Sequence, residues 1–454
     1  MTPPRRVIVV GGGLAGLVAA YRLVTGGADC DVLLIEASSR LGGKLRTERD
    51  DGFTVELGAD SFVPRSGEVE ALAGELGLGD QIVAAADCAV RSYRRDARGF
   101  FPFLAGGGSP VSRPGSLLDN PALSFLGRAR VRLEPYVAKR RSDEDESARS
   151  FIERRLGTRA YSEVYEPLLG GIFGGDPAEL SAAATLAPLV AVEARGGSLL
   201  RDVGPPKGSS TPPPVRSFAD GMSSLTDRLA EAVRTTGRID TDAAVTSLRL
   251  DGDTWLARTR EGREERAETV ILALPIDSTR IVLGELGDLP PSLAEERGTQ
   301  TGVVSLGYEA AACERALDAH GYLNARGTGV GVSACTWSST KFDGRAPQGH
   351  ILLRCFIRGD HDPDDIVELS RKELADSLGI TAAPARSWAH TWSVPVYRVG
   401  HADRVAAFRA RAEALTGIFV AGASYDGVGI EAVIRSGTRA AAAAGGNEAI
   451  QEAS

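Results

Sequence analysis

The sequence predicts an α/β protein in which separated pieces of the chain build one nucleotide-binding domain. Three observations favour this fold class. Residues 7–10 form a short β-branched run that leads directly into glycines, as expected for a strand buried on both faces of a parallel sheet. The chain ends in a strand-like segment, 417–424, and an alanine-rich helix, 431–444. Separate strand-like runs between 300 and 360 predict a second sheet.

The first fifty residues carry a dinucleotide-binding pattern. Gly11-Gly-Gly-Leu-Ala-Gly16 follows the first strand, and a helix-like segment and a second strand complete a βαβ unit. Gly11 permits a tight turn, Gly13 lets a pyrophosphate approach the backbone, and Gly16 allows the helix to pack closely on the strand. Glu36, twenty residues beyond Gly16, can accept hydrogen bonds from a ribose. The glycine pattern alone is weak evidence among 54 glycines, but the whole succession predicts a dinucleotide site.

The rest of the chain alternates between predicted elements and loops. Strands are expected at 53–61, 243–259 (a hairpin around Asp251-Gly-Asp253), 269–275 (closing the first sheet), 303–308, 329–337 and 351–357. Helices are expected at 68–78 and within 125–170, including 144–156 with its acidic first turn and basic end. Segments rich in Gly, Pro and Ser mark loops or boundaries at 99–121 and 195–214.

Composition excludes several classes of protein. The 454 residues are 43% hydrophobic and 25% charged, which is typical of a globular protein, and the net charge of −8 gives no general attraction to nucleic acid. Five scattered cysteines without a C-x-x-C pair predict neither a disulfide framework nor a zinc site, and we expect no metal. We expect no signal peptide and no membrane span, and therefore a cytoplasmic protein.

A second glycine pair identifies the class of dinucleotide. Ala37-Ser-Ser-Arg40-Leu-Gly-Gly43-Lys44 resembles the R-x-G-G-[RK] element of the glutathione-reductase-like FAD superfamily, which includes amine oxidases and desaturases. No second G-x-G-x-x-G follows a later strand, so a separate NAD(P)H domain is not expected. The electron acceptor is then oxygen or a quinone-like molecule.

Later motifs resemble the oxygen-dependent protoporphyrinogen/coproporphyrinogen III oxidase family along nearly the whole chain. They are Tyr165 to Ser181, Ser217 to Leu225, Ala334 to Phe342 with Arg345-Ala-Pro347, Pro395-Val-Tyr397 with Gly400-His401, and Gly422 to Ile430. The chain departs from the family at Pro395-Val-Tyr397, where P-Q-Y is common, and at Pro102-Phe-Leu, where P-L-P is expected.

This resemblance implies a fold with three parts. A glutathione-reductase-like, Rossmann-type FAD domain is expected from 1–90, 215–290 and 395–454, in an amine-oxidase-like architecture. A helical insertion, 100–210, is expected to be a membrane-facing candidate, and 291–394 with parts of 91–100 is expected to be an α+β substrate domain.

The resemblance also implies chemistry and site residues. FAD is expected to take hydrides from a porphyrinogen and pass electrons to oxygen, so no acid–base residue is nominated. Expected FAD contacts are Gly11, Gly13, Gly16, Glu36, Ala37, Arg40, Gly43, Lys44, Gly58, Ala59, Asp60, Ser61, Val245, Trp392, Gly422, Val428, Gly429 and Ile430, with a helix starting near Ile430 beside the flavin. Expected substrate contacts are Arg91 to a propionate, Leu323 and Phe342 around the macrocycle, and Gly171 and Gly174 for close approach. For each substrate residue, an ordinary structural role is about as well supported.

Several functions stay open from the sequence. A coproporphyrinogen III oxidase is favoured over a protoporphyrinogen IX oxidase because the arginine-rich, lysine-poor composition indicates a GC-rich bacterium, where this family serves the coproporphyrin branch of haem synthesis. A flavin amine oxidase or desaturase leaves the later motifs unexplained, and a non-catalytic flavin or porphyrin carrier has no need of intact flavin motifs. Expected partners are a tetrapyrrole and oxygen, with peripheral membrane contact and transient contact with the next haem-pathway enzyme left open.

Overall fold

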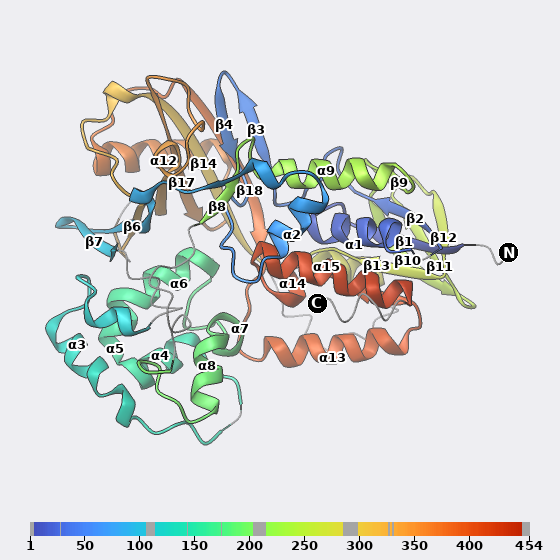
Figure 1. Ribbon diagram of the computed structural model, residues 1–454, viewed down its shortest axis with the longest axis horizontal. Coiled ribbons are helices and arrows are strands. Elements are labelled where there is room, and N and C mark those ends of the chain that lie inside the picture. The colour runs from blue at the N-terminus through green and yellow to red at the C-terminus, as the bar shows by residue number, and fades with distance from the viewer. Residues whose placement is uncertain are drawn as a thin grey trace.

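The computed structural model describes residues 4–27, 29–105, 114–142, 144–173, 175–202, 215–284, 298–325, 327–328 and 331–446. In the described part of the chain, five parallel strands form a sheet in the order β19-β13-β1-β2-β9 (Figure 1). Their bounds are Ile418–Val420 (β19), Thr269–Leu272 (β13), Arg5–Val10 (β1), Cys30–Ile35 (β2) and Arg238–Asp240 (β9). The expected assembly from the start, middle and end of the chain is confirmed. The expectation that 269–275 closes the sheet is wrong, because β13 is interior and β19 forms the edge.

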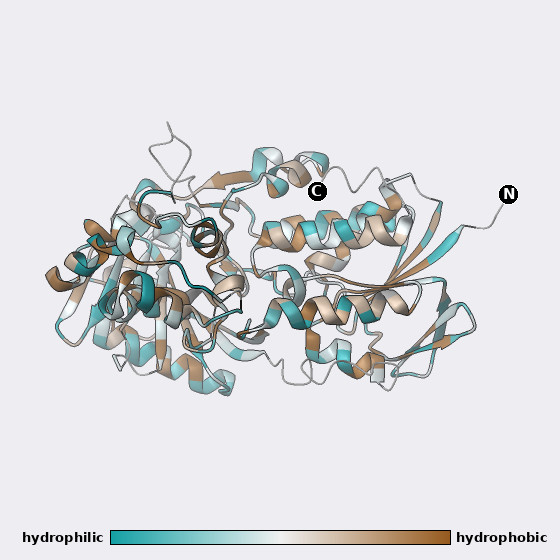
Figure 2. Cartoon of the chain, turned by 90° about the horizontal axis from the view of Figure 1, so that it is seen from below, coloured by the Kyte–Doolittle hydropathy of each residue, from teal (hydrophilic) through white to brown (hydrophobic). Residues whose placement is uncertain are grey.

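Alternating residues of β1 serve two different cores. Val7 and Val9 belong to a cluster with α1 (Leu14–Thr25), α9 (Ser223–Arg234) and α15 (Ile430–Gly445). Ile8 and Val10 belong to a second cluster on the other face of the sheet, with a three-stranded antiparallel sheet and α13 (His401–Ala414). Both faces are therefore covered, which is the environment that continuous β-branched strands require. The helices around the sheet carry both hydrophilic and hydrophobic residues (Figure 2).

The expected second sheet is present and has seven strands, in the order β18-β14-β17-β16-β15-β6-β7. Their bounds are Arg386–Val394 (β18), Thr299–Glu309 (β14), His350–Arg358 (β17), Val332–Trp337 (β16), Gly321–Asn324 (β15), Arg91–Asp96 (β6) and Gly99–Ala105 (β7). All neighbouring pairs are antiparallel except β15 with β6. Helix α12 (Pro363–Leu378) supplies apolar residues to the core on one face of this sheet.

Short helices between residues 125 and 194 pack around their own apolar core below the seven-stranded sheet in Figure 1. They are α3 (Phe125–Arg132), α4 (Ala148–Leu156), α5 (Thr158–Ala160), the π-helical turn η5 (Tyr161–Tyr165), α6 (Glu166–Phe173), α7 (Ala182–Thr185) and α8 (Ala187–Ala194). The expected start of a helix at Glu144 is wrong. The Ser147 hydroxyl accepts from the Ser150 N–H and caps α4, so the helix begins at Ala148, while the expected basic end is confirmed.

The remaining elements connect these parts. The strands are β3 (Thr47–Asp50), β4 (Phe53–Glu56), β5 (Ile82–Ala84), β8 (Arg216–Phe218), β10 (Val245–Asp251), β11 (Thr254–Thr259) and β12 (Glu264–Ala267). The helices are α2 (Glu68–Glu75), α10 (Ile276–Leu283), α11 (Ser338–Lys341), α14 (Ala423–Asp426) and the 3₁₀ turns η1 (Gly79–Gln81), η2 (Asp87–Val90), η3 (Pro114–Leu118), η4 (Glu134–Tyr136) and η8 (Ala310–Ala312). The hairpin expected at 243–259 is confirmed by antiparallel pairing of β10 with β11. No described helix is long and apolar enough to cross a bilayer.

Candidate cofactor site

A cavity of about 540 Å³ opens at the carboxyl ends of strands β1, β2, β13 and β19. Ligands of parallel α/β sheets bind at this edge. Of the residues expected to contact FAD, eleven line this cavity: Gly11, Gly13, Glu36, Ala37, Gly43, Lys44, Ala59, Val245, Gly422, Val428 and Ile430. The fold therefore brings together segments that lie more than 400 residues apart in the sequence.

The glycines at the start of α1 leave room where a ligand must approach. Gly11 has φ +107°, and a Cβ there would lie 2.6 Å from the carbonyl oxygen of Ala273. A Cβ on Gly16 would lie 1.9 Å from the Gly11 carbonyl, so close contact of helix and strand requires glycine. Gly13 differs, because the nearest atom to its Cβ position is 3.9 Å away and the position faces the cavity. Helix α1 has no side-chain cap and no acidic residue in its first turn, so its free N–H groups can bind an anion.

Glu36 lies in the cavity wall with its carboxylate fixed by the neighbouring loops. Oε2 accepts from the Gly12 N–H at 2.7 Å, and Oε1 accepts from the Ser38 N–H at 2.9 Å. A carboxylate has about four acceptor positions, so these bonds orient the group and leave capacity for a ribose hydroxyl.

Lys44 provides an unpaired cation in the same wall. Its ammonium makes no hydrogen bond or ion pair with any residue that the structure describes. Desolvation by the surrounding protein lowers the pKa of Lys44 to about 8. A cation held in a cavity without a counter-charge is a favourable site for an anionic group such as a pyrophosphate.

Arg40 does not line the cavity. Its guanidinium donates to the backbone carbonyls of Leu41 at 2.7 Å, Leu45 at 3.1 Å and Gly43 at 2.6 Å. These bonds fasten the second glycine loop, whose Gly43 approaches Gly13 so closely that an added Cβ would be 3.0 Å from the Gly13 Cα. The geometry gives Arg40 a structural part in the cavity wall rather than direct contact.

The segment from Gly58 to Ser61 contributes only Ala59 to the wall. Asp60 and Ser61 instead face a lysine from the second sheet. The Lys341 Nζ lies 2.9 Å from Asp60 Oδ2 and 2.9 Å from Ser61 Oγ, and an Arg354 nitrogen lies 3.7 Å from the same Asp60 oxygen. Burial raises the pKa of Asp60, but the Lys341 and Arg354 cations outweigh burial and hold this pKa well below its usual range. The carboxylate is therefore charged and internally paired.

Sequence reasoning gave Lys341 no role. The lysine is 2% exposed and its partner Asp60 lies 281 residues earlier in the chain. The available signal was its position beside apolar and aromatic residues in a chain with only five lysines. A lysine in such a segment is more often buried and paired than a surface lysine would be.

The C-terminal residues complete the far end of the cavity. The helix expected near Ile430 is confirmed, since α15 begins at Ile430 with Gly429 as its cap residue. The Glu431 carboxylate accepts from the backbone N–H groups of Arg65, Ser66 and Gly67 at 3.0–3.2 Å, which anchors this helix start to another loop. Trp392, on β18, does not line the cavity and stacks on His390 at 5.7 Å between ring centroids.

The expected substrate residues lie on the second sheet and the helices below it. Leu323, on β15, packs against the core of the helical segment. Phe342 is buried, with the Lys341 ammonium 5.2 Å and the Arg345 guanidinium 5.5 Å from its ring centroid. Gly171 is in α6, and Gly174 lies outside the described residues. Arg91 is half exposed, with Nη1 4.0 Å from Asp318 Oδ2.

Comparisons with known proteins extend over nearly the whole chain. A family model described as flavin containing amine oxidoreductase matches residues 14–444. The coproporphyrinogen III oxidase of Bacillus subtilis (strain 168) is 28% identical, covering 96% of this chain and 97% of its own. That of Propionibacterium freudenreichii subsp. freudenreichii is 30% identical, covering 93% and 88%. A crystal structure from Exiguobacterium sp. 255-15, assigned as a protoporphyrinogen oxidase, superposes with a TM-score of 0.84 at 27% identity, covering 98% and 99%.

Proposed function

Because the chain belongs to the flavin-containing amine oxidoreductases, we propose that it is an FAD-dependent oxidase that converts coproporphyrinogen III to coproporphyrin III in haem biosynthesis. Six electrons and six protons leave the macrocycle, and oxygen takes them up as hydrogen peroxide. The observation that carries this proposal is near-full-length similarity to proteins named coproporphyrinogen III oxidase from several bacteria.

The cavity residues fit the cofactor that the family uses. The open position at Gly13, the free N–H groups of α1 and the unpaired Lys44 ammonium suit a pyrophosphate, and Glu36 suits a ribose. The start of α15 directs partial positive charge towards the opposite end of the cavity, where it stabilises negative charge. FAD, when bound, supplies the hydride acceptor and returns the electrons to oxygen.

The second sheet and the helices below it are where we place the substrate. Leu323 and Phe342 support the macrocycle in this proposal, with Gly171 and Gly174 giving it access to the backbone of the helical segment. The chain divides accordingly into an FAD domain (1–90, 215–290 and 395–454), a helical insertion (100–210) and a substrate domain (291–394 with parts of 91–100). No side chain is required as a base, because a pyrrole N–H can release its proton through the conjugated ring.

Turnover of two substrates by the purified holoenzyme tests the proposal. Coproporphyrinogen III should be oxidised with a larger kcat/KM than protoporphyrinogen IX, with porphyrin fluorescence and hydrogen peroxide appearing together and no need for NAD(P)H. A preference for protoporphyrinogen IX would assign the second candidate, which the similarity to the Exiguobacterium structure favours. Oxidation of neither substrate would contradict the proposal and leave amine oxidation or carriage of a porphyrin as the function to examine.

We also propose that one surface of the helical insertion contacts an anionic membrane. Four large apolar side chains in and just after α3 are strongly exposed: Phe125 (78%), Leu126 (62%), Leu133 (57%) and Tyr136 (82%). Residues 124–141 contain six basic side chains and one acidic one, in a chain whose net charge is −8. Exposed aromatic and aliphatic groups beside clustered arginines are complementary to a negatively charged bilayer surface.

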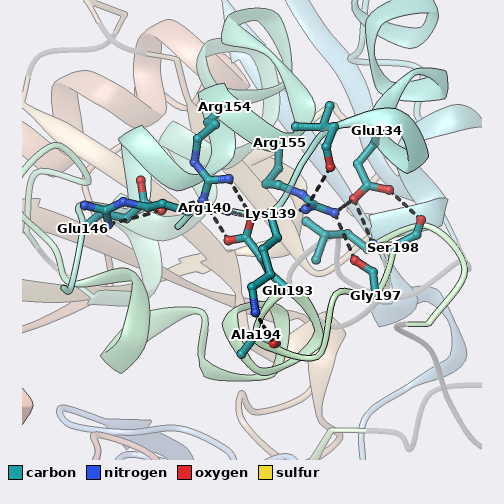
Figure 3. A network of polar contacts seen from close by, with 12 residues as sticks. Glu134, Lys139, Arg140, Glu146, Arg154, Arg155, Glu193, Ala194, Gly197 and Ser198 are labelled. Atoms are coloured by element: carbon teal, nitrogen blue, oxygen red, sulfur yellow. Dashed lines mark hydrogen bonds and ion pairs between the residues drawn. The ribbon is translucent and has the colours of Figure 1, made fainter. Parts of the chain in front are cut away.

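The apolar residues of this surface are held in place from below. Glu134, between Leu133 and Tyr136, is completely buried; its carboxylate is paired with Arg155 and accepts from the Ser198 hydroxyl at 2.6 Å. Figure 3 shows the Arg155 guanidinium between Glu134 and Glu193, the latter at 3.2 Å. The network fixes the η4 turn, so Leu133 and Tyr136 remain outward at little entropic cost on binding.

Vesicle flotation tests this contact. The holoenzyme should float with phosphatidylglycerol vesicles and not with phosphatidylcholine vesicles, and high salt should release it. A Phe125→Ser/Tyr136→Ser double variant should lose flotation, whereas Val63→Ser, at an exposed apolar residue elsewhere, should not. Equal flotation of the double variant and the wild type would refute the assigned surface.

A further inference from the structure

One row of residues crosses the whole seven-stranded sheet. The strand registers pair His390 with Val303, Val303 with Phe356, Phe356 with Ala334, Ala334 with Leu323, Leu323 with Arg94, and Arg94 with Phe101. Side chains directly opposite one another on neighbouring strands lie on the same face of a sheet. Arg94 therefore shares its face with Leu323, the residue expected beside the macrocycle.

The two faces of this sheet differ in exposure. The residues that alternate with the row, among them Val304, Cys355, Cys335 and Tyr322, are at most 2% exposed and belong to the core that includes α12. On the opposite face Phe356, Ala334, Leu323 and Arg94 are each only partly buried. Helix α6 contacts β15 on the chain side below this sheet, as Figure 1 shows. The row thus offers an apolar floor with a guanidinium near one end.

The Arg94 guanidinium has no partner among the described residues. Its Nε is buried and accepts no hydrogen-bond acceptor, and no ion pair joins the side chain to a carboxylate. Asp96, the acidic residue on the same face of β6, is engaged by Arg98 instead, with Nη2 3.0 Å and the backbone N–H 2.9 Å from its oxygens. A partly buried guanidinium without an anion is unfavourable in the free protein and favourable for a carboxylate ligand.

Arg91 occupies the other face. It is separated from Tyr93 and Arg95 by two-residue steps, and both of these contribute to the α12 side of the sheet: Tyr93 packs against that core and Arg95 pairs with Glu373. The Arg91 guanidinium is near Asp318, and its carbonyl accepts from the His320 N–H at 2.9 Å. Its direction is therefore away from Leu323.

We infer that Arg94, rather than Arg91, binds a carboxylate of the substrate while the apolar residues of the row support the macrocycle. The inference rests on the proposed function, because it takes a propionate-bearing tetrapyrrole as the ligand. A guanidinium can hold a carboxylate by two parallel hydrogen bonds, which fixes the in-plane rotation of a flat ligand as well as its charge.

Steady-state kinetics of matched variants tests the inference. Arg94→Gln should raise the KM for coproporphyrinogen III by about tenfold to a hundredfold with a smaller change in kcat, as for loss of a hydrogen bond to a charged group that is made equally in the ground and transition states. Arg94→Lys should recover only part of this loss. Arg249→Gln, which removes an exposed arginine of β10, reports the effect of losing one positive charge alone. FAD content should be unchanged in all variants, since none of these residues lines the cofactor cavity.

Two results would overturn the inference while leaving the proposed function intact. The first is a wild-type enzyme that oxidises coproporphyrinogen III and an Arg94→Gln variant no more affected than Arg249→Gln. The second is a larger KM effect in Arg91→Gln than in Arg94→Gln. If the wild type oxidises no porphyrinogen, the proposed function fails, and fluorescence titration with coproporphyrin III still tests the residue. Arg94→Gln must then weaken coproporphyrin binding but not the binding of a porphyrin without carboxylates, and equal effects on both would refute the role.

Discussion

Replacing Lys341 by methionine should destabilise the folded protein by about 3 kcal/mol, the lower part of the range for breaking a buried ion pair. The structure sets this magnitude. Lys341 is 2% exposed and donates to Asp60 and Ser61 at 2.9 Å each, so its removal leaves a buried carboxylate without its nearest cation. Arg354 remains 3.7 Å from Asp60 and limits the loss. Methionine fills a similar volume, so the cost is mainly electrostatic.

Urea unfolding of the FAD-free protein, followed by circular dichroism, measures this cost. Lys372→Met is the matched control, because Lys372 has a 61% exposed side chain and only a loose contact with Glu368 at 3.9 Å; a change below about 0.5 kcal/mol is expected there. The difference between Lys341→Met and the wild type should also shrink as the pH falls below about 4. The depressed pKa of Asp60 contributes stability above the unfolded-state pKa, and this stability is lost towards the lower folded-state pKa. Equal stabilities of the two variants at neutral pH would refute the reasoning.

Three further predictions concern the cofactor. Gly13→Leu should abolish FAD retention, measured as the flavin released on heat denaturation, because a side chain there would enter the cavity. Glu36→Ala should weaken FAD binding by about 1.5 to 3 kcal/mol, the range for hydrogen bonds to a charged group, and titration of the FAD-free protein would show a weaker effect if the carboxylate only stabilises its loops. FAD affinity should be constant below pH 8 and fall above it, because the Lys44 pKa of about 8 in the empty cavity rises when an anion binds; Lys44→Met should remove this pH dependence, and its persistence would show that another group is responsible.

The sequence was informative where a requirement is local. Gly11 and Gly16 could be assigned because a turn followed by helix-on-strand packing demands glycine within a few residues, and the structure shows the close contacts that require it. The start of α15 at Ile430 was predictable for the same reason. The start of α4 was not, because a choice between Glu144 and Ala148 depends on which side chain caps the helix, and Ser147 does so.

Residues whose role depends on distant strands could not be placed in this way. Whether Arg91 or Arg94 faces Leu323 depends on the parallel pairing of β6 with β15, which joins segments more than 220 residues apart. Shifting this pairing by one residue would exchange the two faces, and no motif in the sequence specifies it. The same limit applies to Asp60, expected to contact FAD and found paired with Lys341 from α11.

The order of the strands in the parallel sheet also has a consequence for how the protein is made. Strand β1 is synthesised first, but its neighbour β13 follows about 260 residues later, and β19 and α15 are among the final segments of the chain. Gly422, Val428 and Ile430 of the cavity wall emerge from the ribosome after nearly everything else. The nascent chain therefore cannot form the complete cofactor site during most of translation, and long-range pairing of this kind is intrinsically slow. Flavin insertion must be a late event, and a ribosome that stalls within the last tenth of the message releases a protein with most of its strands but no place for its cofactor.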